Sequence, residues 1–457
     1  MNQMFILLIL FGSQIGLSDF LLLPVHAARS GELSFLLLYA VFKLVIVLPL
    51  LHAELVAGRY QGVSPVELAT ERRGRPWARA LLVCLLAAVL CVLAINLYNA
   101  SWTLAVGWDG LSGRVAGFDR LDRVLYWYEL GLQNERLIAL IFLQVLLLGA
   151  VAIFAWTGAA LVYAVVIPLC LILMLVQLPE VVVLLQQWNW HPIGVGETIT
   201  ALQYALTSSM AGFMVWYLIG SRLPLSLPTG RWVLAAQLFD LCLGLVIVAT
   251  LHSGLAQTDI TGSEAGVVLQ ALVAQLAQSD GLSPTWATFV AVGSVVGALG
   301  SLPLLLHFSL VHTGRSSRRW LIAGLAAALV LALLLQLSAR VEPRLTWYGL
   351  PLTELFSRFA FSLVAPAMAL LTTLWVGWGL SPNQVLKQVN PRTGGRYLAW
   401  RLAVKVLIPI AVALVFVRAT LGFGGASPTQ ILAVAILLLV LWRLFDWLRH
   451  QSVYPRF

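Results

Sequence analysis

The sequence has little charge and little of the chemistry that enzymes use. Only 10% of its 457 residues are charged, against about 25% in ordinary soluble domains, which excludes a soluble globular protein. Its seven histidines are scattered, no glycine-rich loop follows a strand, and no Ser/His/Asp grouping has the context of a catalytic site. The sequence therefore does not favour an enzyme.

Cysteine is also scarce. The four cysteines, Cys84, Cys91, Cys170 and Cys242, all lie in apolar runs, where cysteine behaves as a small buried hydrophobe. Neither a disulfide framework nor a metal-ligand spacing is present. We therefore expect no cofactor other than a coupling ion.

Long apolar runs are abundant instead. Hydrophobic residues make up 60% of the chain, and the mean hydropathy is +0.92. Runs of about 20 residues are long enough to cross roughly 30 Å of hydrocarbon as helices, and twelve of them predict an all-α, multi-pass membrane protein. The predicted spans are 4–27, 34–57, 80–106, 137–156, 159–185, one from Thr198, 232–251, 286–311, 321–337, 352–378, 398–417 and 431–448.

The net charge of +9 is placed in a way that indicates orientation rather than a nucleic-acid partner. Arg and Lys gather in alternate loops, such as 59–79, and such loops lie in the cytoplasm. Both termini are then cytoplasmic. A cleaved signal peptide is the alternative reading of the first span, but it has no basic N-terminal region, and Asp19 and Pro24 interrupt it.

Two spans, the first and the sixth, carry small and polar residues at mid-membrane. These residues are Gly12, Ser13, Gln14, Gly16, Ser18 and Asp19 in the first span, and Thr207, Ser208, Ser209, Ala211 and Gly212 in the sixth. Unwound backbone persists in a membrane only where it lines a cavity or binds something. Both spans are therefore predicted to be broken at a binding site.

The two broken spans stand five helices apart, so the two halves insert with opposite orientation. This is the inverted repeat of many secondary transporters, in which the substrate site lies at the repeat interface. We expect a first repeat over residues 1–186, a second over 187–380, and two further helices over 381–457. A short re-entrant or interfacial helix is expected at 265–276.

Ionisable residues inside spans are costly and need a partner or a function. Asp19 is the leading candidate for a site residue, as a ligand of sodium or as a proton carrier. Lys43 and Asp240 favour structural pairing with another helix, and Glu54 favours helix packing.

The first spans contain strings that resemble the neurotransmitter:sodium symporters, in particular the bacterial leucine transporter branch. They are GSQIGLSDFLLLPVHAARSG from Gly12, HAELVAGRY from His52 and YNASWTL from Tyr98, with weaker echoes in LQYALTSSMAG, GALGS and VLIP. The resemblance implies the leucine-transporter fold, with a five-plus-five inverted repeat and alternating access. It also implies the inner membrane of a bacterium.

The resemblance also implies site residues. The substrate-binding residues would be Gly16, Leu17, Ser18, Val92, Asn96, Leu206, Ser209, Gly212 and Leu305. One sodium site would use Gly12, Ile15, Gly297 and Ser301, and a second would use Gln14, Asp19 and Thr207. Thr207 and Ser209 have a plainer alternative, which is a hydrogen bond back to their own helix.

Several family positions are changed here. Gly300 stands where a sodium-binding hydroxyl is expected, Asn96 replaces a tyrosine, and Gly212 replaces an aromatic lid. The outer-gate arginine aligns with Leu22, although its acidic partner is kept as Glu354. Arg358 lies four residues further on, so either a gate or a local ion pair is expected.

The sequence thus predicts a secondary active transporter of an amino acid or a similar small solute, coupled to a cation through degenerate sodium sites. Its expected partners are this solute and the lipid bilayer, no nucleic acid is expected, and a protein partner is left open. The alternatives are proton coupling through Asp19, and a non-transporting receptor or complex subunit on the same scaffold.

Overall fold

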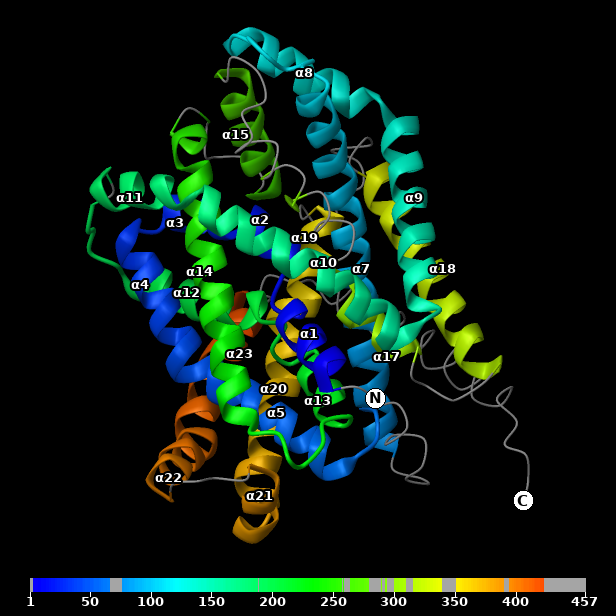
Figure 1. Cartoon of the computed structure of the whole chain (residues 1–457), viewed down its shortest axis with the longest axis vertical. Coiled ribbons are helices and arrows are strands. Elements are labelled where there is room, and N and C mark those ends of the chain that lie inside the picture. The colour runs from blue at the N-terminus through cyan, green and yellow to red at the C-terminus, as the bar shows by residue number, and fades with distance from the viewer. Residues whose placement is uncertain are drawn as a thin grey trace.

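The protein is helical throughout the part of the chain that the computed structural model describes. That part comprises residues 3–65, 76–187, 189–256, 258, 264–278, 289, 292–293, 300–309, 315–338, 351–389 and 394–422. Figure 1 shows the helices as one bundle, with α8 at one end and α21 and α22 at the other.

The helices of the first half follow the predicted spans. In chain order they are α1 (Gln3–Gly12), α2 (Leu17–Leu21), α3 (Leu23–Arg29), α4 (Leu33–Phe42), the π-helix η1 (Lys43–Val47), α5 (Leu48–Gln61), α7 (Pro76–Leu111), α8 (Arg120–Leu132), α9 (Asn134–Ala152), α10 (Ala155–Val176) and α11 (Leu178–Gln187).

The second half continues in the same way. Its helices are α12 (Val195–Ser208), α13 (Val215–Gly220), α14 (Thr229–Leu255), α15 (Glu264–Gln278), α17 (Leu302–Ser309), α18 (Arg315–Ser338), α19 (Leu352–Ser357), η2 (Arg358–Val364), α20 (Ala365–Leu374), η3 (Trp375–Gly379), α21 (Pro382–Val389), α22 (Gly394–Leu402), η4 (Ala403–Leu407) and α23 (Ile408–Gly422).

Eight helical stretches within the described residues are long and apolar enough to cross a membrane. They coincide with the predicted spans two, three, four, five, seven, nine, ten and eleven. Span one is divided among α1, α2 and α3, and span six between α12 and α13. Span eight is described at 289, 292–293 and 300–309, and span twelve lies outside the described residues. An all-α membrane protein is confirmed.

One predicted boundary is wrong. Span five was expected to reach Leu185, but α10 ends at Val176, and α11 is a separate helix. The apolar run 159–185 contains no charge before Glu180, so hydropathy alone does not reveal the turn at Gln177. The helix predicted at 265–276 is present as α15, which packs against α14.

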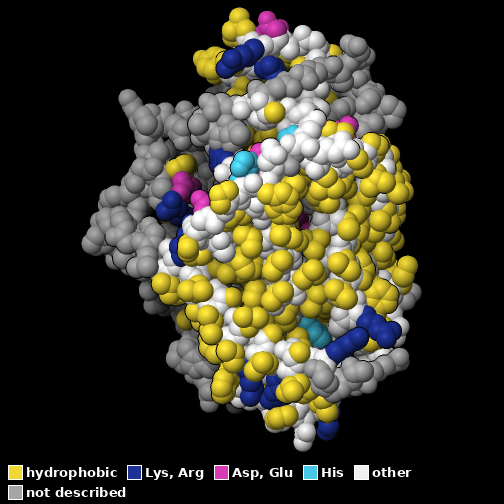
Figure 2. All heavy atoms as spheres, turned by 90° about the vertical axis from the view of Figure 1, so that its left-hand side faces the viewer, with side chains coloured by type: hydrophobic (Ala, Val, Ile, Leu, Met, Phe, Trp, Pro, Cys, Tyr) yellow, Lys and Arg dark blue, Asp and Glu magenta, His cyan; other side chains and the backbone are white. Residues whose placement is uncertain are grey.

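The bundle has a buried centre and a lipid-facing rim. In the most apolar window of α7, 72% of the residues are buried, against 28% in α9. Leucines on the outer helices, such as Leu146 and Leu175, are largely exposed, as expected where lipid replaces water. Figure 2 shows one such face, on which hydrophobic side chains predominate and Lys and Arg lie toward the ends.

Candidate functional site

The first break lies where the sequence predicts it. α1 ends at Gly12, and α2 begins at Leu17. The last turn of α1 is closed by Ser13, whose backbone N–H donates to Ile9 O and whose hydroxyl donates to Leu10 O, both at 2.8 Å. Ile15 and Gly16 then form the extended link between the two helices.

The second break separates α12, which ends at Ser208, from α13, which begins at Val215. Three residues of the link have positive φ: Met210 (52°), Gly212 (83°) and Met214 (59°). Gly212 also lies directly against α20, because a Cβ at this position would be 1.9 Å from Ala365 O. The family's aromatic lid has no room here, and only glycine fits this position.

Two buried side chains satisfy the backbone that the second break frees. Glu54 of α5 accepts a hydrogen bond from the Gly212 N–H at 2.6 Å. His307 of α17 donates through Nε2 to Phe213 O at 2.9 Å. Unwound backbone inside a membrane must be paired in this way. The packing role expected for Glu54 thus takes the form of a support for the second break.

His307 was not anticipated from the sequence. The only available signal was a histidine within the apolar span 286–311. Its contact with Phe213 joins residues 94 positions apart, and no local pattern predicts such a contact.

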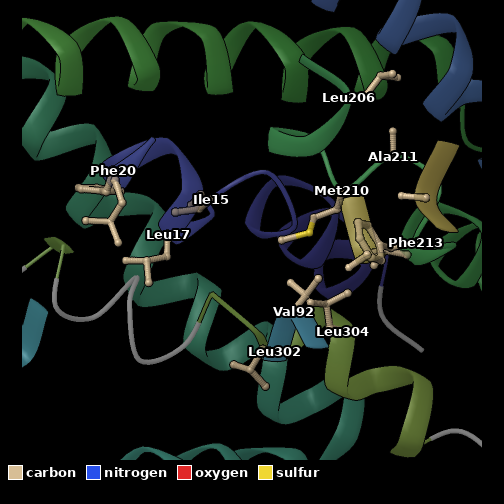
Figure 3. Close-up of a cluster of buried hydrophobic side chains, with 14 of the residues drawn as sticks. Ile15, Leu17, Phe20, Val92, Leu206, Met210, Ala211, Phe213, Leu302 and Leu304 are labelled. Carbon is tan, nitrogen blue, oxygen red and sulfur yellow. The ribbon is translucent and has the colours of Figure 1, made fainter. Parts of the chain in front are cut away.

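Apolar side chains fill the space between the two breaks. Figure 3 shows Ile15 and Leu17 on one side, Leu206, Met210, Ala211 and Phe213 on another, and Val92, Leu302 and Leu304 below them. In this view the buried Met210 side chain extends from the second break toward the side on which Ile15 lies. Val92, Leu206 and Leu305, which the resemblance assigns to the substrate, are all buried.

The remaining predicted lining residues behave differently. Gly212 and Ser209 lie in the second break itself, and the Ser209 hydroxyl has no hydrogen-bond partner among the described residues. Gly16 precedes α2, and Leu17 and Ser18 form its first turn. Their role toward a substrate stays a prediction.

A charged cluster lies beside the breaks. We use this name for Asp19 of α2, Lys43 of η1 and Asp240 of α14. The Lys43 ammonium forms an ion pair with Asp240 Oδ2, and it also interacts electrostatically with Asp19. All three side chains are at most 1% exposed.

Two tyrosines surround the charged cluster. The Tyr204 hydroxyl, from α12, donates to Asp19 Oδ1 at 3.4 Å. The Lys43 Nζ lies 5.2 Å from the ring centroid of Tyr39, whose hydroxyl shares a 3.2 Å hydrogen bond with Ser208. His26 of α3 packs against the Tyr204 ring. The predicted spans one, two, six and seven therefore meet at this cluster.

The pairing of Lys43 with Asp240 confirms the structural partnership expected for these two residues. Their meeting with Asp19 was not foreseen, because 197 residues separate Lys43 from Asp240 in the sequence. The π-helix η1 (Lys43–Val47) was not foreseen from the sequence either. Such π-helical turns are often found at functional sites.

The side chains of the other residues predicted for the second sodium site are bound to protein groups. The Thr207 hydroxyl donates to Gln203 O at 2.9 Å, which is the back-bonding alternative. The Gln14 side chain accepts a hydrogen bond from Gln237 Nε2 of α14 through Oε1, whereas the ligand that the resemblance implies is the Gln14 backbone carbonyl.

The first predicted sodium site corresponds to a neutral region between α1, α7, α10 and α17. In it, Asn96 Nδ2 donates to the Ser301 hydroxyl at 3.0 Å. Gly12 packs against the Tyr163 ring of α10, where a Cβ would be only 2.2 Å away. Gly300 supplies no hydroxyl, and Gly297 lies outside the described residues.

At both places the side chains differ from the expected sodium ligands, and sodium binding there stays a prediction. The charged cluster already contains a cation in Lys43. In the neutral region, one of the two expected hydroxyls is missing, and an amide occupies the other.

The predicted gate residues form a local ion pair. Arg358 donates to Glu354 Oε1 four residues earlier, and both side chains are more than a third exposed. Leu22, at the family's arginine position, precedes α3. A gating role for Glu354 and Arg358 stays a prediction.

Comparisons with known proteins support the fold but give no family. No family model matches the chain, and no curated protein matches it. Among solved structures, 162 chains match. One is the crystal structure of MhsT in complex with L-phenylalanine, with a TM-score of 0.78 at 17% identity, covering 92% of this chain and 98% of that one. MhsT is a transporter with the neurotransmitter:sodium symporter fold, and this chain has the same fold.

Proposed function

We propose that this protein is a secondary active transporter that moves a small solute across a membrane by alternating access. The observation that carries the proposal is the pair of breaks in the first and sixth predicted spans, the second of which is held by side chains of α5 and α17. A helix breaks in a membrane at a marked free-energy cost, and such breaks are typical of transporter binding sites.

The lining favours a solute with an apolar side chain. Ile15, Val92, Leu206 and Met210 present hydrocarbon and a thioether, while the linking backbone offers polar groups for the other end of the solute. The complex of MhsT with L-phenylalanine agrees with this assignment, and we propose an amino acid or a similar compound. Methionine adapts its shape readily, so movement of Met210 would make room for the ligand.

The test is uptake into proteoliposomes. Purified protein is first screened with amino acids and amines for ligands that raise its melting temperature, and the radiolabelled hit is then offered to vesicles with an imposed ion gradient. Gradient-dependent uptake supports the proposal. Binding without flux at any gradient would instead support a receptor or complex subunit on this scaffold.

A matched pair of variants shows whether uptake uses the proposed site. Met210→Trp should abolish both binding and uptake by filling the space between the breaks, whereas Leu146→Trp on the lipid-facing surface of α9 should leave both intact. Equal loss in the two variants would place the ligand elsewhere.

Proton coupling through Asp19 is a second candidate. It is favoured by one observation, which is that Asp19 Oδ2 is buried without a hydrogen-bond partner among the described residues. Asp19→Asn should then abolish uptake driven by a proton gradient while leaving ligand binding in place. Retained uptake with an unchanged pH dependence would eliminate this candidate.

We place the protein in the bacterial inner membrane with both termini in the cytoplasm, as the basic loops indicate.

A further inference from the structure

The Lys43 ammonium pairs with the carboxylate of Asp240 and interacts electrostatically with the carboxylate of Asp19, which belongs to another helix. The resemblance to the symporter family implies two asparagine ligands of a sodium ion, which align with Asp19 and with Phe239, the residue before Asp240. In this chain Lys43 pairs with Asp240, the neighbour of the second position, and interacts electrostatically with Asp19 at the first. We infer that the Lys43 ammonium is a permanent, tethered cation that replaces this sodium ion, so that no sodium binds at the charged cluster.

Burial supports this assignment. Lys43 is 0% exposed, and Asp19 and Asp240 are each 1% exposed, so water does not neutralise their charges. A buried charge needs a partner, and two acidic residues at this depth need a cation between them. Lys43 supplies that cation from η1 with no ion taken from solution.

Charge accounting leads to the same result. Two carboxylates and one ammonium carry a formal charge of −1, the same as two carboxylates and one sodium ion. A sodium ion would have to compete with the tethered ammonium for the same two carboxylates, and the ammonium would repel it.

The groups around the cluster leave Lys43 as its cation. Tyr39 and Tyr204 contribute hydroxyls, and His26 packs against Tyr204 from α3. The ammonium is also attracted to the face of the Tyr39 ring. Removal of Lys43 should therefore turn the cluster into an acidic chamber with affinity for a small cation.

The decisive experiment compares the wild type with Lys43→Ala by thermal unfolding in detergent. Both proteins are measured in sodium chloride and in choline chloride at equal ionic strength, which separates sodium binding from charge screening. The wild type should melt at the same temperature in both salts. Lys43→Ala should melt several degrees lower in choline and recover most of that loss in sodium.

Three further variants keep the inference falsifiable. Lys43→Gln, which preserves most of the side-chain volume, should show the same sodium response even if Lys43→Ala folds poorly. The double variant Lys43→Met/Asp240→Leu, which has a single carboxylate left, should lose that response. Lys405→Ala removes a lysine that stacks on Trp378 outside the cluster, and it should show no sodium response.

Two results would overturn the inference. One is a sodium-specific stabilisation of the wild type equal to that of Lys43→Ala, and the other is a lack of sodium response in both Lys43→Ala and Lys43→Gln. One further test rests on the proposed function. In it, uptake by the wild type is measured, and it should be unchanged when choline replaces sodium. Absence of any uptake would count against the transporter, whereas the melting temperatures decide the role of Lys43 independently.

Discussion

The charged cluster and the neutral region, where the resemblance predicts two sodium sites, are built in opposite ways. In the cluster, the carboxylates of Asp19 and Asp240 remain in need of a cation, and Lys43 provides it. In the neutral region, the hydroxyl expected at Gly300 is absent, and Asn96 binds the one at Ser301. The charged cluster thus contains carboxylates whose charge is balanced by a lysine of the same chain. The neutral region is held by a hydrogen bond and by packing.

Asp240→Ala should have the largest effect of the changes that test this comparison. It leaves the Lys43 ammonium buried with Asp19 as its remaining carboxylate, and removing one partner of a buried ion pair costs about 3–5 kcal/mol. Unfolding in detergent, followed by circular dichroism, measures the loss.

Glu354→Ala is the matched control, because it also removes one partner of an ion pair. The pair of Glu354 with Arg358 is more than a third exposed, and exposed pairs contribute about 0–1 kcal/mol. Equal losses in Asp240→Ala and Glu354→Ala would show that the cluster is hydrated, and would remove the contrast with the neutral region.

Gly12→Ala should have the next largest effect, because it tests whether the neutral region is packed or hollow. The new methyl group would lie 2.2 Å from the Tyr163 ring, and overpacking of this kind costs about 1–3 kcal/mol. The melting temperature should fall although alanine is the better helix former.

Gly196→Ala controls for the backbone, since it is also in a helix and no atom lies within 4 Å of the added carbon. It should be neutral or slightly stabilising. A tolerated Gly12→Ala would mean that Tyr163 is free to move and that the region can open.

The contrast between the two regions was only partly predictable from the sequence. Gly12 and Gly16 in the first span and Gly212 in the sixth helped to predict the two breaks, because the tendency of a helix to unwind is a local property. The two contacts that define the regions, Lys43 with Asp240 and Asn96 with Ser301, join residues about 200 positions apart. Such pairings arise from tertiary packing, and no periodicity or motif in one sequence specifies them.

Asn96→Ala should have a smaller effect. It removes the hydrogen bond to Ser301, and a neutral pair of this kind contributes about 0.5–1.5 kcal/mol. A double-mutant cycle with Ser301→Ala isolates the contribution of the pair. Neither variant should gain a sodium response, since Gly300 still lacks a hydroxyl. A sodium-specific rise in the melting temperature of Asn96→Ala would mean that a cation site survives under the amide.

Tyr163→Phe should have the smallest effect, and it sharpens the comparison most directly. The Tyr163 hydroxyl is buried and has no hydrogen-bond partner among the described residues, so its removal should leave stability unchanged or raise it by up to about 1 kcal/mol. A loss of more than about 1 kcal/mol in thermal unfolding would instead show that the hydroxyl binds something in the native protein. A partner such as water or an ion beside Gly12 would make this region a polar site like the charged cluster, because a purely apolar contact gains nothing from the oxygen.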